Sequence, residues 1–63
     1  MIKFEVGRKY TGSGMTGSCE MTVLKRTLKM IRFKTVLGTF NAKIRDYYLD
    51  RDSVGHQAWL YTA

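Results

Sequence analysis

The sequence predicts an all-β fold, a small antiparallel sheet or half-barrel of four to five strands that assembles into oligomers. Three observations indicate this fold. Apolar and polar residues alternate over residues 2–6 and again over residues 40–45, which is typical of half-buried strands. β-branched and aromatic residues are frequent in the middle of the chain, and these residue types pack well on a pleated surface. The segments between the predicted strands are short, so neighbouring strands are expected to pair antiparallel.

The length of the chain explains why self-association is expected. Its 63 residues predict one small β domain that spans residues 1–63. A chain of this length buries only about 60% of the surface that its unfolded form exposes, so the core needs additional support. Cys19 is the single cysteine, which rules out an intramolecular disulfide, and Cys19 with His56 cannot supply the four ligands of a structural zinc site. We therefore predict a homo-oligomer that holds no metal and no cofactor.

The charge balance is strongly basic. Eleven lysines and arginines stand against five acidic residues, so the net charge is +6 with neutral histidine. Such an excess favours polyanionic partners. No apolar run reaches the roughly 18 residues that a membrane span needs, and the N-terminus lacks the apolar core of a signal peptide. We therefore expect a soluble intracellular protein with no membrane partner.

The first third of the chain is predicted to form a strand followed by a loop. The strand begins with residues 2–6, where Ile2, Phe4 and Val6 share the buried face, and continues through residues 7–10. Residues 11–18 contain three glycines and four hydroxyl residues. This composition predicts a flexible loop.

The segment 19–37 allows two interpretations. A helical stripe can be drawn through Met21, Leu24, Leu28 and Ile31. With basic residues opposite, this stripe would form an amphipathic helix able to lie on an anionic membrane. Period two also fits, because Ile31 and Phe33 fall on one face and Arg32 and Lys34 on the other. The β-branched residues and the missing N-cap favour two strands with a turn near residues 26–28.

The remainder of the chain is predicted to add further strands. After a turn at residues 38–39, the alternating residues 40–45 form a strand that continues to residue 49. The inward side chains of this strand are Phe40, Ala42 and Ile44. Residues 50–55 are predicted as a polar turn, and residues 56–63 as a short closing strand.

A cluster of cations is the main functional signal. The predicted nucleic-acid-binding residues of the alternating strands are Arg32, Lys34, Lys43, Arg45, Tyr47 and Tyr48. If residues 30–35 and 40–45 pair antiparallel, their four cations share one sheet face. Like charges directly opposite one another destabilise a sheet, and a bound anion would offset that cost. Basic and aromatic side chains on a β surface resemble the sites that hold single-stranded nucleic acid, with phosphates on cations and bases stacked on rings.

Two other interpretations of this face remain open. The cations could bind a protein with an acidic or nucleic-acid-mimicking surface, or they could form a solvated face that keeps a small protein soluble. Tyr47 and Tyr48 are neighbours in a strand and point to opposite faces, so only one of them can stack on a ligand.

Other chemically capable residues are interpreted as structural. Asp46, Asp50 and Asp52 lie within seven residues, and clustered carboxylates can hold Mg²⁺ for phosphodiester chemistry. Their spacing matches no recognised metal motif, and aspartates in turns usually form the turn itself. His56 is predicted at the surface or at a strand end, and Cys19 as a buried thiol. No catalytic residue is assigned, and the protein is expected to be a binding protein more than an enzyme.

A resemblance to a known family sharpens the functional expectation. The residues that carry it are Phe4-x-Val6-Gly7-x-x-Tyr10, then a polar loop, Val23-x-x-Arg26-Thr27, and later Lys43-Ile44. Over nearly the whole chain, this pattern resembles small proteins encoded in phages and mobile elements of gut Firmicutes. That family includes an anti-CRISPR protein that counters an RNA-guided nuclease. The resemblance implies an oligomeric sheet fold similar to that of single-strand-binding transcriptional coactivators, and the cytoplasm of a bacterial host cell as its location.

The resemblance also bears on individual residues. It implies that Arg26 contributes to function and joins the nucleic-acid-binding residues, and that Phe4, Val6, Gly7 and Tyr10 form the scaffold. The chain departs from the family's pattern in two places. Thr16 and Gly17 stand where the first loop has an aspartate, and a late glutamate is missing around residues 54–56. These departures put carboxylate-dependent nicking of DNA in doubt.

The predicted function is therefore nucleic-acid binding by a basic mobile-element protein. Single-stranded or supercoiled DNA is the expected partner, and inhibition of a host defence such as a CRISPR effector nuclease is the expected outcome. One alternative is a protein–protein inhibitor that binds the effector nuclease directly. The other is a metal-dependent DNA nickase.

Overall fold

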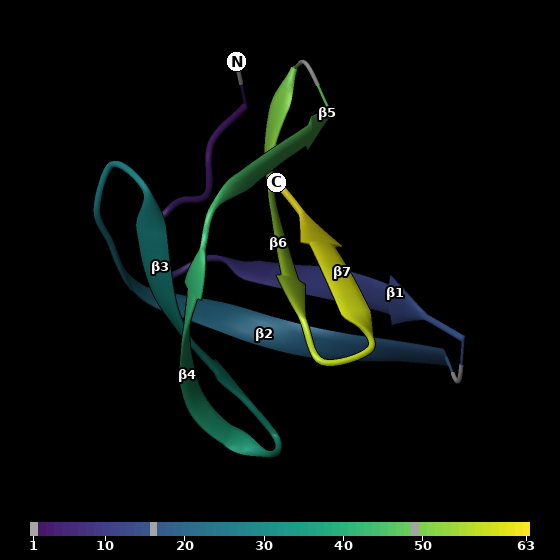
Figure 1. The fold of residues 1–63 in the computed structure, drawn as a ribbon. Coiled ribbons are helices and arrows are strands. Elements are labelled where there is room, and N and C mark those ends of the chain that lie inside the picture. Colours follow the sequence, from purple (N-terminus) through teal and green to yellow (C-terminus); the bar gives the residue numbers. More distant parts are fainter. Residues whose placement is uncertain (1, 16, 49) are drawn as a thin grey trace.

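The predicted all-β architecture is confirmed. The computed structural model describes residues 2–15, 17–48 and 50–63. Over these residues, seven strands form one antiparallel sheet in the order β4-β3-β2-β1-β7-β6-β5, which is more strands than the four to five predicted (Figure 1). The strands are β1 (Lys9–Gly14), β2 (Gly17–Arg26), β3 (Met30–Thr35), β4 (Gly38–Lys43), β5 (Arg45–Tyr48), β6 (Arg51–His56) and β7 (Trp59–Thr62).

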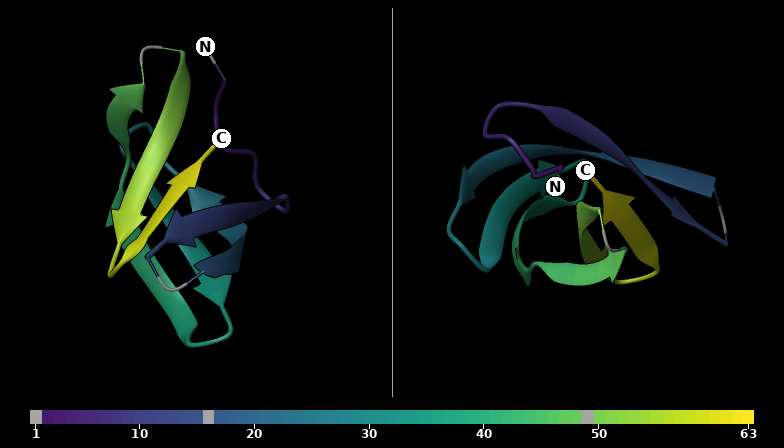
Figure 2. Two further views of the ribbon diagram at one scale, coloured as in Figure 1. Left: turned by 90° about the vertical axis from the view of Figure 1, so that its right-hand side faces the viewer. Right: turned by 90° about the horizontal axis from the view of Figure 1, so that it is seen from above.

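The sheet curls into a half-barrel. Its two edge strands, β4 and β5, are consecutive in the chain and are separated only by Ile44. The Ile44 N–H donates to the Lys29 carbonyl at 2.7 Å, which ties this bend to the turn between β2 and β3. Figure 2 shows the curled sheet from above, with β2 along one side and β5 and β6 along the opposite side. The outer surfaces of these two sides therefore face different directions.

The segment 19–37, for which the sequence allows a helix or two strands, forms two strands and a turn, as favoured from the sequence. β2 and β3 pair antiparallel up to Arg26 and Ile31. In the turn between them, the Thr27 N–H donates to the Met30 carbonyl at 2.8 Å, and the Met30 N–H donates to the Thr27 hydroxyl at 3.2 Å. The amphipathic helix is excluded, and with it the proposed membrane-surface role of that helix.

The predicted strand at residues 2–6 is wrong. Of these residues, only Ile2 pairs with another segment, beside Arg51: its N–H donates to the Asp50 carbonyl and its carbonyl accepts from the Asp52 N–H, each at 2.8 Å. Phe4 is buried as predicted, but Ile2 and Val6 are exposed. The Phe4 ring packs edge-on against Tyr10 with the centroids 4.9 Å apart. Of the three alternating apolar residues, only Phe4 is therefore anchored in the core, and residues 2–6 do not form a strand with one buried face.

The predicted flexible loop at residues 11–18 is also wrong. It belongs to the β1–β2 hairpin, apart from the connection between the strands, in which Thr16 lies outside the described residues. A Cβ atom added to Gly12 would lie 2.6 Å from a ring carbon of Tyr61, and one on Gly14 would lie 2.9 Å from the Trp59 ring. These glycines make room for aromatic rings of the neighbouring strand, which is a known use of glycine in sheets.

The predicted polar turn at residues 50–55 is a third error. Residues 51–56 form β6, in which Asp52, Ser53 and Val54 are buried. The predicted strand end at Leu49 lies outside the described residues. The predicted final strand is confirmed as β7, which lies between β1 and β6 and begins at Trp59 and not at His56, after a turn in which Gln57 adopts the left-handed conformation with φ of 55°.

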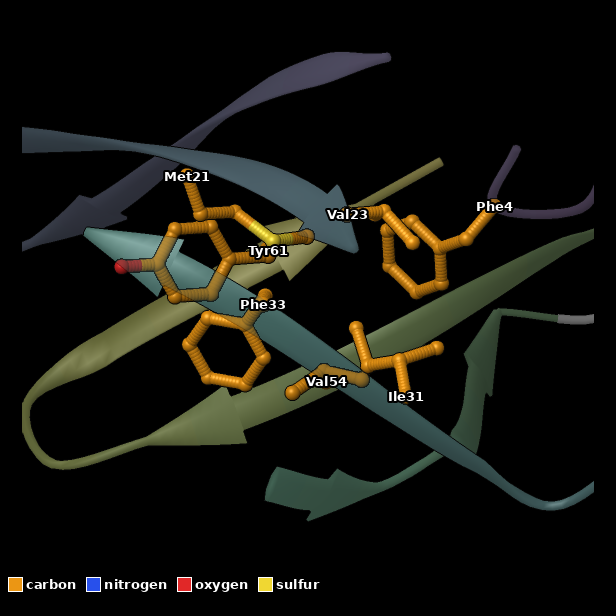
Figure 3. Packing of buried hydrophobic residues seen from close by; sticks show 7 residues of the cluster. All are labelled: Phe4, Met21, Val23, Ile31, Phe33, Val54 and Tyr61. Atoms are coloured by element: carbon orange, nitrogen blue, oxygen red, sulfur yellow. The ribbon is translucent and has the colours of Figure 1, made fainter. Parts of the chain in front are cut away.

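The hydrophobic core fills the inside of the half-barrel (Figure 3). Its buried apolar members are Phe4, Met21, Val23, Ile31, Phe33, Val54 and Tyr61. The inward orientation predicted for Ile31 and Phe33 is confirmed, because β3 alternates between exposed and buried residues along its whole length. Each such side chain contributes roughly 1.5–3 kcal/mol through burial. Among the described residues, no helix has the length and apolar character needed to cross a membrane.

Candidate nucleic-acid interface

Cationic side chains gather on the outer face of β1–β4 because of the strand register. One row of Cα partners across the sheet consists of Lys9, Thr22, Lys34 and Thr39. The next row consists of Lys25, Arg32 and Asn41. A third row pairs Met30 with Lys43. We call the five exposed cations of these rows the outer cation face: Lys9, Lys25, Arg32, Lys34 and Lys43.

A β-bulge in β2 decides which basic residues reach this face. β2 and β3 keep one register up to Val23 and a register shifted by one residue from Lys25 onward, so Leu24 is the extra residue. An extra residue reverses the alternation of side chains beyond it. The bulge therefore places Lys25 opposite Arg32 on the outer face and turns Arg26 towards the inside.

Arg26 lies in a buried network and not on the outer cation face. Its Nη1 donates to Oδ2 of Asp52 and to the carbonyl of Phe4, each at 2.9 Å, and only 19% of its side chain is exposed. The Asp52 carboxylate, 7% exposed, also accepts a hydrogen bond from the Phe4 N–H at 3.3 Å. The pair thus joins β2, β6 and the N-terminal segment.

The acidic side chains lie mostly away from the outer cation face. Glu5 pairs with Arg8 at 2.7 Å, and Asp50 pairs with Arg51 at 3.1 Å. The hydrogen bond from Arg51 lowers the pKa of Asp50, so this carboxylate stays charged to lower pH than usual. On the described outer face of β1–β4, Glu20 is the one acid, 3.9 Å from the Lys9 ammonium.

Four cations of the face consequently have no carboxylate partner among the described residues. They are Lys25, Arg32, Lys34 and Lys43.

Two shallow hollows lie among these cations. The first, of about 350 Å³, is lined by Lys25, Arg26, Thr27, Met30, Ile31, Arg32 and Asn41. The second, of about 370 Å³, is lined by Lys9, Glu20, Thr22, Lys34, Thr35 and Val36. Both hollows combine cationic groups with apolar side chains. Phosphate groups and flat apolar rings could therefore bind side by side on this surface.

The structure separates the other predicted site residues from the outer cation face. Arg45 lies beyond the bend at Ile44 and pairs with Ser53 of β6. Tyr47 and Tyr48 belong to β5 and are 59% and 44% exposed. β5 and β6 lie on the side of the half-barrel opposite β2 (Figure 2). Arg32, Lys34 and Lys43 are therefore brought together, whereas Arg45 and the two tyrosines are not brought to them.

Two cations of the face were missed by the sequence analysis. Lys25 reaches the face only because of the bulge at Leu24, which depends on the pairing of β2 with β3. Lys9 is not predicted on the face because residues 11–18, which follow it in the β1–β2 hairpin, have the composition of a loop. Its local signal was the alternation of Lys9, Thr11 and Ser13 with the small or half-buried residues between them.

The three aspartates considered for metal binding do not converge. Asp52 is buried beside Arg26, whereas Asp50 is exposed beside Arg51. In the part of the chain that the structure describes, no group of three or more histidine, cysteine, aspartate and glutamate side chains could hold a metal ion.

His56 and Cys19 both lie on the inner side of the sheet. His56 ends β6, as predicted, and its ring centroid is 4.4 Å from that of Phe40. Cys19 is half-buried and interacts with the Tyr61 hydroxyl. Burial raises the pKa of Tyr61, and the hydrogen bond with Cys19 raises it further. Tyr61 therefore stays neutral, and its stabilising effect is lost only as the pH rises above the usual tyrosine range.

The Lys25–Arg32 pair is expected to lower the stability of the free protein. The two cations are direct cross-strand partners, and like charges in this position destabilise a sheet by roughly 0.2–1 kcal/mol. We expect Lys25→Thr to raise the free energy of unfolding by about that amount in urea titrations at low salt, and the gain to shrink at high salt. Lys43→Thr is the matched control, because Lys43 faces Met30 and not a cation. A less stable Lys25→Thr variant would contradict the prediction.

No family model, no curated protein and no solved structure matches the chain. The function of the protein is therefore inferred from the geometry of the outer cation face.

Proposed function

We propose that the protein binds single-stranded nucleic acid on its outer cation face. The observation that carries the proposal is the convergence of Lys25, Arg32, Lys34 and Lys43 on one face without carboxylate partners among the described residues. Phosphate groups are the natural ligands of such a surface, because arginine and lysine side chains bind them through charge-assisted hydrogen bonds.

The distribution of charge favours a ligand over a purely solvated surface. A face that only keeps a protein soluble usually mixes both signs of charge. Here the acids Glu5, Asp50 and Asp52 pair with cations outside the face. The face even keeps Lys25 opposite Arg32, an arrangement that costs stability in the free protein. A bound polyanion would remove this cost.

The shape of the face favours a single strand over a duplex. The two hollows lie between cations and have apolar side chains such as Met30 and Val36 in their walls. An unpaired base can turn away from its backbone and pack against such a wall while its phosphates contact the cations. The bases of a duplex are stacked inside and cannot enter a shallow hollow without unpairing.

The salt dependence of binding tests the proposal. If the five cations of the face neutralise about five phosphates, the logarithm of the association constant should fall with the logarithm of salt concentration at a slope of roughly −3.5. Fluorescence anisotropy with a short labelled thymidine strand measures this slope. A flat dependence would refute binding through phosphates. A saturable complex with an effector nuclease in nuclease-treated samples, without oligonucleotide binding, would favour the protein–protein inhibitor instead.

The proposal includes the setting that the family resemblance implies. A homo-oligomer would place several outer cation faces along one strand, and interference with an RNA-guided nuclease would follow from occupying DNA that the nuclease needs. The exposed side chain of Leu37, in the turn between β3 and β4 and outside both hollows, provides apolar surface for self-association. Light scattering after size-exclusion chromatography, with and without the oligonucleotide, measures the oligomeric state.

A further inference from the structure

The hollow beside Arg32 contains an ordered set of hydrogen-bond donors. The Arg32 Nε donates to Oδ1 of Asn41 across β3 and β4 at 3.1 Å. This hydrogen bond engages the amide oxygen and leaves the Asn41 Nδ2 and the two terminal nitrogens of Arg32 as donors. The Thr27 hydroxyl, also at this hollow, is engaged with the backbone of Met30. The side-chain groups that remain for a ligand are therefore mainly donors.

The same hydrogen bond orients the guanidinium. An arginine whose Nε is held by a neighbour keeps its two terminal nitrogens in a defined plane, which reduces the freedom lost when a ligand binds. The lining of the hollow includes Lys25 and Met30, and the apolar side chain of Met30 is partly exposed on the outer face. A flat ring can pack on this side chain while its edge meets the donors.

We propose that this hollow recognises guanine within a single strand; the inference rests on the proposed function and deepens it by naming the base. Guanine presents two neighbouring acceptors, N7 and O6, and an arginine guanidinium contacts both at once. On the same edge, which faces the major groove in a duplex, adenine places an amino donor beside its N7, cytosine presents an amino donor, and thymine presents one carbonyl beside a methyl group. A set of donors anchored by Arg32 and Asn41 matches guanine best.

Binding of short single strands that differ at one position tests the inference. The strands are a thymidine strand, the same strand with one central guanine, and the same strand with 7-deazaguanine, which lacks the N7 acceptor. We expect guanine to raise the affinity roughly fivefold or more, which corresponds to the lower end of a bidentate arginine–guanine contact. The 7-deazaguanine strand is expected to lose most of that gain.

A charge-conserving variant separates base recognition from phosphate binding. Arg32→Lys keeps the positive charge but lacks the planar pair of donors. We expect it to lose the preference for guanine, measured as the ratio of its affinities for the guanine and thymidine strands, whatever its absolute affinity for the thymidine strand. Arg45→Lys is the matched control, because Arg45 lies outside the hollow. It should keep the preference.

The outcomes distinguish the two proposals. Equal, salt-dependent binding of all three strands would overturn guanine recognition and leave the proposed function standing. A guanine preference that survives Arg32→Lys would overturn the assignment to this hollow. No binding of any strand would overturn both proposals.

Discussion

Replacing Arg32 and Lys43 together with glutamate is expected to abolish single-strand binding and to leave the fold intact. Of the four cations of the face that have no carboxylate partner among the described residues, the double variant removes two and adds two anions in their place. Each phosphate contact contributes about tenfold at low salt, so the affinity should fall by ~100-fold or more. Fluorescence anisotropy measures the affinity, and circular dichroism with urea titration measures the fold and its stability. Both side chains are exposed, so their loss removes little packing.

A variant with the same change of net charge is the control for this result. Lys3→Glu with Arg45→Glu also exchanges one lysine and one arginine, at exposed positions outside the outer cation face. It should retain most of the affinity. Equal losses in the two double variants would show that overall charge and not the face determines binding. Unchanged affinity of the Arg32 and Lys43 variant would assign the face to solubility alone.

Asp52→Ala is expected to have the largest effect on stability. The substitution leaves the Arg26 guanidinium without its carboxylate and the Phe4 N–H without its acceptor. Removing one partner of a buried ion pair costs about 3–5 kcal/mol. A chain of this length has a total stability of roughly 3–9 kcal/mol. The variant should therefore lose about a third or more of its free energy of unfolding, as circular dichroism during urea or thermal unfolding would reveal.

Two further variants make this prediction specific. Asp50→Ala removes the exposed pair with Arg51 and should cost less than about 1 kcal/mol. The double variant Arg26→Met with Asp52→Leu replaces the buried pair by apolar groups and should recover much of the stability. If Asp52→Ala were as stable as Asp50→Ala, the network of Arg26 would have no structural role. If the folded double variant lost strand binding, Arg26 would belong to the interface, as the family resemblance implies.

The class of the fold and the central residues of the candidate site could be predicted from the sequence. The alternation in residues 30–35 correctly separated buried Ile31 and Phe33 from exposed Arg32 and Lys34. Side chains of a strand alternate between two faces at every residue, so this information is local and can be seen in one segment. The position of Lys43 on the same face followed from the same alternation in the next strand.

The surroundings of the other residues depend on how distant segments of the chain pack together. The sequence around Gly12 is typical of a loop, but the Tyr61 ring of β7 packs over this glycine in the sheet. The sequence around Asp52 is typical of a turn, but Asp52 is buried and paired with Arg26. The bulge at Leu24, which exchanges the faces of Lys25 and Arg26, depends on the register between two strands. Each of these outcomes depends on a contact between segments distant in the chain. Local composition contains no signal for such a contact, because the residues that flank a glycine or an aspartate in the sequence do not show which distant side chain packs against it.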